Sequence, residues 1–187
     1  DTVVTRLGLA HLVKAIEDNE LVAAAGPYTN CAASQQQIDA PYSSLDQIEL
    51  FSNHFSALNW PDQSTDLLIG FCLAIRNSVF EQIGGFDTSF QIGMFEDNDF
   101  CYRLKRDGYQ LKIAGKSYIH HEGSKSFQRS NIRMSEVFRK NREVFFRKWS
   151  KDLESGFASH LPESGARPVV FDQTRRPEDA ERRSDDL

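Results

Sequence analysis

Three acidic side chains near the middle of the chain are candidates for acid–base chemistry. Glu96, Asp97 and Asp99 lie where the sequence pattern predicts the start of a helix. The unpaired N–H groups and the dipole of a helix N-terminus favour ionised carboxylates. An ionised carboxylate that is held in place can accept the proton of an attacking hydroxyl. Asp97 is therefore a candidate general base, and the alternative is that it only caps the helix.

A pair of histidines farther along the chain has the chemistry of a metal site. His120 and His121 follow a short apolar segment and precede Glu122. Neutral imidazole, together with carboxylates, is a suitable ligand for Mn2+-like divalent cations. The pattern predicts a divalent metal site in this loop, and the alternative is that both imidazoles are ordinary packed side chains.

Apolar periodicity indicates the elements that must position these groups. Gly70 lies inside the most apolar run, which reads as a central strand, and glycine within a strand often marks a close approach of backbone or ligand. Strands mixed with helices predict an α/β sandwich. The pattern predicts helices over 6–19, 48–55, 79–83, 97–107 and 131–149, and strands over 21–25, 67–75, 111–113 and 117–119.

Composition excludes several classes of protein. The 187 residues include 40% hydrophobic and 11% aromatic side chains, enough for the core of one domain. The net charge of −5 argues against a globally basic nucleic-acid binder, and no apolar run reaches the ~18–20 residues of a membrane span. Three cysteines without a CxxC pair favour a reduced, cytoplasmic protein without a disulfide framework or zinc site. We expect a globular part over 1–160 and a polar tail over 161–187.

The run from Gly70 to Phe127 resembles the C-terminal, acceptor-side half of family-2 inverting glycosyltransferases of the GT-A fold. The motifs stand in the order and spacing typical of that family. They are a glycine-containing strand followed by an arginine (Gly70 to Arg76), a Gly-Gly-Phe-Asp turn (Gly84 to Asp87), a Glu-Asp-x-Asp-Phe helix start (Glu96 to Phe100) with Arg103, a Gly-Tyr pair (Gly108-Tyr109), a His-x-Gly-Ser-x-Ser-Phe element (His121 to Phe127), and the trailing Asn141, Phe145 and Lys148-Trp149.

The beginning of the chain also resembles this family. Asp1 matches the last acid of the family's Asp-x-Asp metal motif, and the strand that ends in Gly26-Pro27 with Asn30 matches the segment that follows it. The resemblance implies a GT-A-like, Rossmann-related mixed sheet with flanking helices. It also implies that the chain is part of a longer protein and lacks the N-terminal βαβ units that bind the donor nucleotide.

The resemblance implies metal-assisted transfer of a sugar from a nucleotide-diphosphate sugar to a hydroxyl acceptor, with inversion. Asp97 would be the general base, and Glu96 would hold acceptor hydroxyls. The ligands of a divalent Mn2+ or Mg2+ would be Asp1 and His121, with His120 as the alternative histidine. Further candidates for substrate binding are Gly70, Arg76, Gly84, Gly85, Trp60 and Asp99.

Structural alternatives stand beside these roles. Asp99 and Arg103 have the i,i+4 spacing of a helix ion pair, Gly84 and Gly85 suit a left-handed turn, and Trp60 suits half-buried packing. The acceptor would be a saccharide or a lipid-linked sugar of a cell-surface polysaccharide. The basic, aromatic last helix would then touch a membrane surface, or be simply solvated, and an exposed sheet edge would pair two copies of the chain.

Two other functions compete with a glycosyltransferase. The first is a non-catalytic carbohydrate-binding or interaction module that keeps the acceptor-side fold. The second is a metal-dependent α/β hydrolase or phosphotransferase that uses Glu96, Asp97 and the histidines. The sequence has no serine nucleophile elbow and no glycine-rich phosphate loop, which argues against the second.

Overall fold

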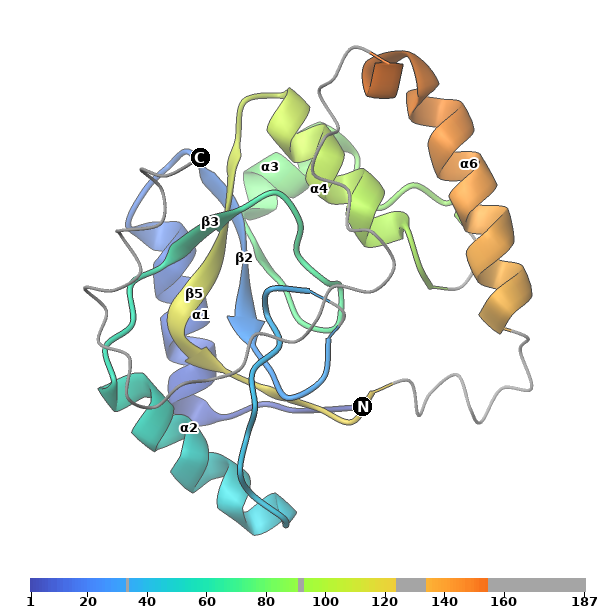
Figure 1. The fold of residues 1–187 in the computed structure, drawn as a ribbon. Helices are drawn as coiled ribbons and strands as arrows, with labels where there is room; N and C mark the ends of the chain where they lie inside the picture. The colour runs from blue at the N-terminus through green and yellow to red at the C-terminus, as the bar shows by residue number, and fades with distance from the viewer. Residues whose placement is uncertain (33, 91–92, 124–133, 155–187) are drawn as a thin grey trace, which may run out of the picture.

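The computed structural model describes residues 1–32, 34–90, 93–123 and 134–154. Its centre is a four-stranded mixed sheet with the order β3-β5-β2-β4 (Figure 1). The two central strands, β2 and β5, are parallel, and both outer strands are antiparallel to their neighbours. A separate antiparallel ribbon joins β1 to β6. The strands are β1 (Thr2–Val3), β2 (Val22–Tyr28), β3 (Gln63–Thr65), β4 (Ala74–Ile75), β5 (Gln110–Tyr118) and β6 (His120–His121).

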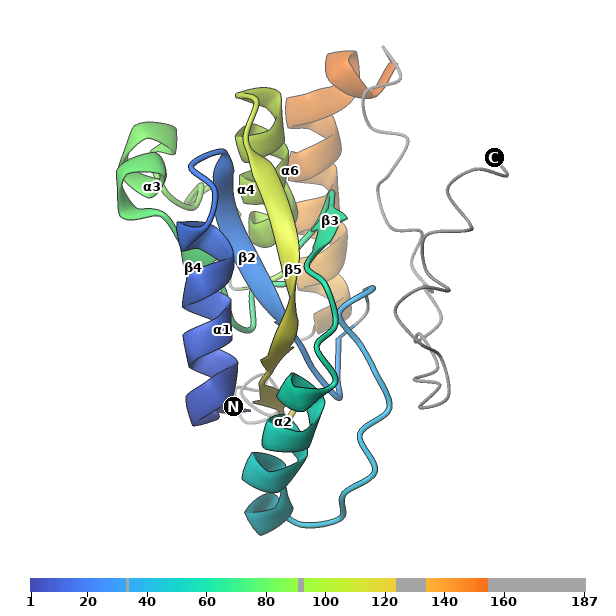
Figure 2. The ribbon, with the colours of Figure 1, turned by 90° about the vertical axis from the view of Figure 1, so that its left-hand side faces the viewer.

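Helices cover both faces of the sheet (Figure 2). The apolar side of α1 packs on one face, where Leu12 contacts the cluster around Ala25. The apolar side of α4 packs on the other, where Phe100 and Leu104 lie in the cluster that contains Leu111. α6 packs outside α4. The helices are α1 (Arg6–Glu17), α2 (Ile48–Ala57), α3 (Asn77–Ile83), α4 (Glu96–Arg106) and α6 (Met134–Glu154), with a 3-10 turn over Leu45–Gln47.

The start of α1 is fixed against the end of β5. The Thr5 hydroxyl accepts the Gly8 N–H at 3.2 Å and donates to the Tyr118 carbonyl at 2.8 Å. A Cβ on Gly8 would lie 2.3 Å from that carbonyl oxygen, so this close approach requires glycine. The contact places the N-terminus of α1, and the β1 strand before it, at the edge of the sheet where β5 ends.

Most expected elements are confirmed, with ends that differ by a few residues. The helices expected over 6–19, 48–55, 79–83 and 97–107 form as α1, α2, α3 and α4, and the strand over 21–25 forms as β2. The two strands expected over 111–113 and 117–119 are one strand, β5. The last helix is confirmed from residue 134 on, whereas its expected first residues and the expected tail lie outside the described residues.

The expected central strand over 67–75 is wrong. Only Ala74–Ile75 forms a strand, and it lies at the edge of the sheet. In the segment before β4, side chains accept the backbone N–H groups. The N–H groups of Leu68, Ile69 and Gly70 donate to the side chains of Cys101, Gln36 and Asp97, respectively. Because these N–H groups are bonded to side chains, they do not form hydrogen bonds to the backbone of a neighbouring strand. In the described part of the chain, no helix has the length and apolar character needed to cross a membrane.

Candidate active site at the carboxyl edge of the sheet

Segments that are distant in sequence meet where the parallel strands β2 and β5 end, which we call the carboxyl edge. Asn30, just after β2, binds the His121 backbone on both sides: its Oδ1 accepts the His121 N–H at 2.9 Å and its Nδ2 donates to the His121 carbonyl at 3.0 Å. Open α/β sheets bind their ligands outside the carboxyl ends of the strands. The carboxyl edge is therefore the part of this fold suited to a ligand.

The structure brings together the predicted metal ligands Asp1 and His121. Pairing of β1 with β6 sets them side by side, and the Asp1 Oδ1 lies 3.7 Å from the His121 Nε2. The His121 Nδ1 lies 2.7 Å from the Cys31 carbonyl oxygen. Because a carbonyl oxygen can only accept, Nδ1 carries the proton. In the neutral ring, Nε2 then presents its lone pair toward the Asp1 carboxylate.

This arrangement fits a divalent cation. A nitrogen lone pair and a carboxylate oxygen repel each other unless a proton or a cation lies between them, and both are ligands that Mn2+ accepts. A metal-binding histidine commonly donates its other ring N–H to a backbone carbonyl, as His121 does here. Among the described residues, no group of three or more His, Cys, Asp or Glu side chains is placed to hold a metal. Asp1 and His121 are two candidate ligands, so a cation here would need further oxygens from a substrate or water to complete its shell.

His120 lies in a different environment from His121. Its Nδ1 is 2.6 Å from the Tyr42 hydroxyl and its Nε2 is 3.4 Å from the Glu122 carboxylate. The Tyr42 hydroxyl also contacts the Tyr118 hydroxyl at 2.5 Å. Successive side chains of a strand point to opposite faces, so the buried His120 ring packs in this network rather than beside Asp1. The structure thus favours His121 over His120 as the metal-binding histidine.

Asp97 is buried at the first turn of α4. Its Oδ2 accepts the Gly70 N–H at 3.0 Å and its Oδ1 accepts the Asn98 N–H at 2.8 Å. Burial raises the pKa of the Asp97 carboxyl, against the opposing effect of these hydrogen bonds. The alternative of an N-cap role is wrong, because the helix begins at Glu96 and Phe95 is the N-cap residue. In the described part of the chain, both hydrogen-bond donors to this carboxylate are backbone N–H groups, and each oxygen keeps a lone pair for a further donor.

Glu96 differs from Asp97 in that one of its oxygens is unsatisfied. The Oε2 atom is buried and has no hydrogen-bond partner among the described residues. Burial, followed by the charge of Asp97, raises the pKa of the Glu96 carboxyl. A buried acceptor without a donor is unfavourable in the free protein, and a ligand hydroxyl would satisfy it.

Two adjacent residues connect the acids to the histidine. Gly70 donates its N–H to Asp97, and the ring of Phe71 stacks on the His121 imidazole, with 4.9 Å between centroids and 15° between planes. A Cβ on Gly70 would contact the Asp97 Cβ at 3.4 Å. Through these two adjacent residues, contacts connect Asp97 with the Asp1–His121 pair. A shared substrate site of the acids and the histidine stays a prediction.

Two predicted substrate-binding residues have structural roles instead. Asp99 has an exposed fraction of 0% and binds Arg103, Lys148 and Trp149, so it cannot reach a substrate. The expected i,i+4 pair with Arg103 is confirmed at 2.8 Å.

Arg76 lies at the far end of α1. Its guanidinium donates to the carbonyl of Ile16 in the last turn of the helix and to that of Asn19 just after it. Since α1 has 12 residues, this end is about 18 Å from the carboxyl edge. The position corrects the expectation that Arg76 binds substrate at this site.

The remaining candidates lie outside the neighbourhood of Asp97. Gly84 ends α3 with a φ of 84° and Gly85 follows with a φ of 68°, which confirms the left-handed turn. Arg103 binds the Gly85 carbonyl, more than one turn along α4 from Asp97. Trp60 is half-buried, and its backbone carbonyl lies against Gly115 of β5. Substrate binding by these residues stays a prediction.

The sequence did not single out Phe71 or Cys31 as parts of the site. Phe71 lies in the apolar run that reads as a strand, and Cys31 acts through its backbone carbonyl. Neither contact can be predicted from residue type, because every residue has a backbone carbonyl and an apolar run contains many side chains like Phe71. Asn30 was noticed only as part of a family motif, and its two bonds to His121 show what the side chain does.

Comparisons with known proteins support the fold. No family model matches the chain, and no curated protein matches it. A crystal structure of GalNAc-T7 with UDP, GalNAc and Mn2+ is similar, with a TM-score of 0.53 and 17% sequence identity. The alignment covers 98% of this chain and 36% of that chain, so this chain spans about a third of its neighbour's length. The expected GT-A-like fold is confirmed, and the resemblance to family 2 stays a prediction.

Proposed function

We propose that the carboxyl edge is the acceptor side of an active site that transfers a sugar from a nucleotide-diphosphate sugar to a hydroxyl. The observation that carries the proposal is the convergence of Asp97 and the Asp1–His121 pair through Gly70 and Phe71. Such a reaction needs a base that deprotonates the acceptor hydroxyl and ligands for a cation that binds the donor diphosphate. The similar structure was solved with UDP, GalNAc and Mn2+, which is consistent with this class of substrate.

Asp97 is the proposed general base. It must be ionised to accept the proton of the acceptor hydroxyl, and its raised pKa makes it a stronger proton acceptor than an exposed carboxylate. The Gly70 and Asn98 N–H groups hold both oxygens in place. Glu96 would bind an acceptor hydroxyl through its unsatisfied Oε2. Direct attack of the deprotonated oxygen on the anomeric carbon inverts its configuration.

Asp1 and His121 would hold a divalent Mn2+ or Mg2+. When bound, the cation supplies positive charge that stabilises the leaving nucleoside diphosphate. The Cys31 carbonyl fixes the tautomer of His121, and the Phe71 ring fixes its plane. We infer that further contacts to the donor nucleotide come from residues beyond this chain, in line with the 36% of the neighbour's chain that it covers.

The test measures transfer with the longest natural form of the protein and a panel of nucleotide-diphosphate sugars with Mn2+ or Mg2+. Asp97→Asn should lower kcat by about 100-fold or more, while the affinity for nucleoside diphosphate and Mn2+ stays unchanged. Glu96→Gln should mainly raise the KM for the acceptor. Nuclear magnetic resonance of the anomeric proton in the product would show whether the configuration inverts.

Two outcomes would contradict parts of this assignment. Retained transfer in Asp97→Asn would mean that another group is the base. An unchanged Mn2+ titration in His121→Ala, with His120→Ala as the matched control, would mean that the cation binds elsewhere.

A non-catalytic carbohydrate-binding module is the second candidate. The limited coverage of the similar chain favours it for this chain taken alone. It predicts saccharide binding that depends on Glu96, without release of nucleoside diphosphate in any natural form of the protein. Detectable turnover with any donor would rule it out.

A further inference from the structure

The segment before the two acids has an unusual backbone. Gly93, Met94 and Phe95 have successive φ angles of 72°, 70° and 71°. Glycine adopts this left-handed conformation readily, but a residue with a Cβ is strained in it. Two consecutive strained residues persist only where surrounding contacts hold them. Because the segment leads directly into Glu96, whatever holds it also sets where the acids lie.

One buried side chain of α6 supplies such contacts. The Asn141 Nδ2 donates to the Gly93 carbonyl at 2.7 Å and to the Met94 carbonyl at 2.9 Å. One NH2 group can do this because it carries two hydrogens. Asn141 is fully buried, and Phe145, one turn farther along α6, packs on the Phe95 ring with 5.6 Å between centroids. α6 thus holds this segment through backbone and side chain together.

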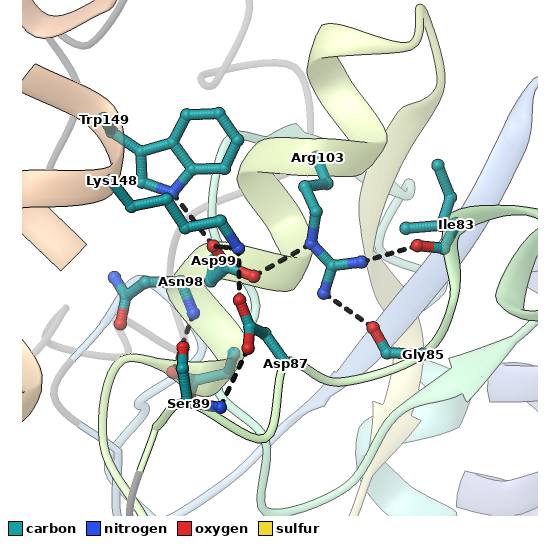
Figure 3. Close-up of polar contacts among 10 residues, drawn as sticks. Ile83, Gly85, Asp87, Ser89, Asn98, Asp99, Arg103, Lys148 and Trp149 are labelled. Carbon is teal, nitrogen blue, oxygen red and sulfur yellow. Dashed lines mark hydrogen bonds and ion pairs between the residues drawn. The ribbon is translucent and has the colours of Figure 1, made fainter. Parts of the chain in front are cut away.

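A separate contact fixes α6 against α4 (Figure 3). The Asp99 Oδ1 accepts from the Trp149 Nε1 at 2.9 Å and from the Lys148 Nζ at 2.8 Å, while its Oδ2 accepts from the Arg103 Nε. Lys148 also reaches the Asp87 carboxylate at 2.5 Å. Because this anchor does not involve the left-handed segment, α6 can stay docked when Asn141 is changed.

We propose that Asn141 is a positioning residue for the candidate base. Its amide holds residues 93–95 in the left-handed conformation, and this conformation places the Asp97 carboxylate against the Gly70 N–H. The inference rests on the proposed function for the role of Asp97, but the positioning itself is a property of the free protein and is measured without substrate.

The test replaces Asn141 by Leu, which keeps the volume but has no N–H to donate. Amide hydrogen exchange is followed in the full chain at two positions: the Gly70 N–H, which binds Asp97, and the Asp99 N–H, which binds the Phe95 carbonyl. Loss of two hydrogen bonds should make both amides exchange about tenfold faster or more, while the amides of β2 and β5 stay protected. Unchanged exchange at Gly70 would overturn the proposal.

Trp149→Phe is the matched control. It removes one hydrogen bond between α4 and α6 without touching residues 93–95. We expect the Gly70 amide to keep its slow exchange in this variant. Faster exchange equal to that of Asn141→Leu would mean that any loosening of α6 has the same effect, and would overturn a specific role of Asn141.

Met94→Gly is the rescue variant, since glycine removes the strain that Asn141 opposes. Added to Asn141→Leu, it should restore slow exchange at Gly70 and Asp99. If Asn141→Leu alone unfolds the whole chain, the double variant decides: recovery of the fold supports the proposal and continued unfolding overturns it. In an active form of the protein, Asn141→Leu should lower kcat and leave the donor KM nearly unchanged, so a failure of the proposed function is seen separately.

Discussion

Glu96, Asp97 and Asp99 lie within one turn of α4 and have three different electrostatic environments. Asp99 pairs with two cations and Asp97 accepts backbone N–H groups, while Glu96 has a buried oxygen for which the described part of the chain offers no donor. The pair of Asp99 with Arg103 could be predicted because i,i+4 spacing is local. The contact with Trp149 could not, because that residue is 50 positions away and no local pattern relates the two.

Replacing Glu96 by Gln should raise the melting temperature at neutral pH. Burial and the Asp97 charge raise the Glu96 pKa, so ionisation costs the folded state more than the unfolded state. Below the ordinary pKa both states hold the proton and the cost is absent; it develops as the pH rises through the folded-state pKa.

Thermal melts at about pH 7 and about pH 4 check this expectation. The advantage of Glu96→Gln should be present in the first buffer and absent in the second. An equal gain in both would show that Gln merely packs better, and the charge argument would fail.

At the scale of elements, buried polar contacts decide how α4 and its neighbours pack. The segment over 67–73 is apolar enough for a strand, yet three consecutive N–H groups in it, at 68–70, donate to side chains of Gln36, Asp97 and Cys101. Apolar periodicity reports burial and says nothing about such acceptors, so this prediction failed. The helices were predicted well because their periodicity, and glycines such as Gly108 after α4, are local signals.

Replacing Asp99 by Ala should destabilise the protein by about 3 kcal/mol, because it leaves Arg103 and Lys148 without their buried partner. Urea unfolding measures the loss. Arg139→Ala is the comparison, since it breaks an exposed pair with Glu143 on α6 and should cost about 0.5 kcal/mol or less. Equal effects of the two variants would show that burial of Asp99 contributes little to its pairing.

At the scale of the whole molecule, the candidate site is assembled from segments spread over the first 121 residues of the chain. The carboxyl edge gathers Asp1, Asn30, Phe71, Asp97 and His121 around the ends of two parallel strands. The family resemblance predicted one site for Asp1, Asp97 and His121, whereas it did not predict that Asn30 and Phe71 lie against His121. The atoms that orient each group were not predicted either, since they depend on how β1 pairs with β6 and how α6 packs.

Deleting residues 1–3 should weaken Mn2+ binding by about tenfold or more, because it removes one of the two proposed ligands. The same deletion should change the melting temperature little, because β1 lies outside the four-stranded sheet and Thr5, which caps α1, is kept. Calorimetric Mn2+ titrations and thermal melts test the two parts. A full-strength titration after the deletion would remove Asp1 from the metal site.

The pairing of β1 with β6 has a practical consequence for anyone who prepares this protein. The Asp1 carbonyl accepts the Glu122 N–H at 2.8 Å, and this hydrogen bond holds Asp1 beside the imidazole of His121. Whatever stretch of polypeptide precedes Asp1 therefore joins the chain next to His121, and a bulky insertion directly before Asp1 would crowd this imidazole. A polyhistidine sequence placed directly before Asp1 would also bind Mn2+ itself, so a tagged version for metal titrations should carry its tag away from Asp1.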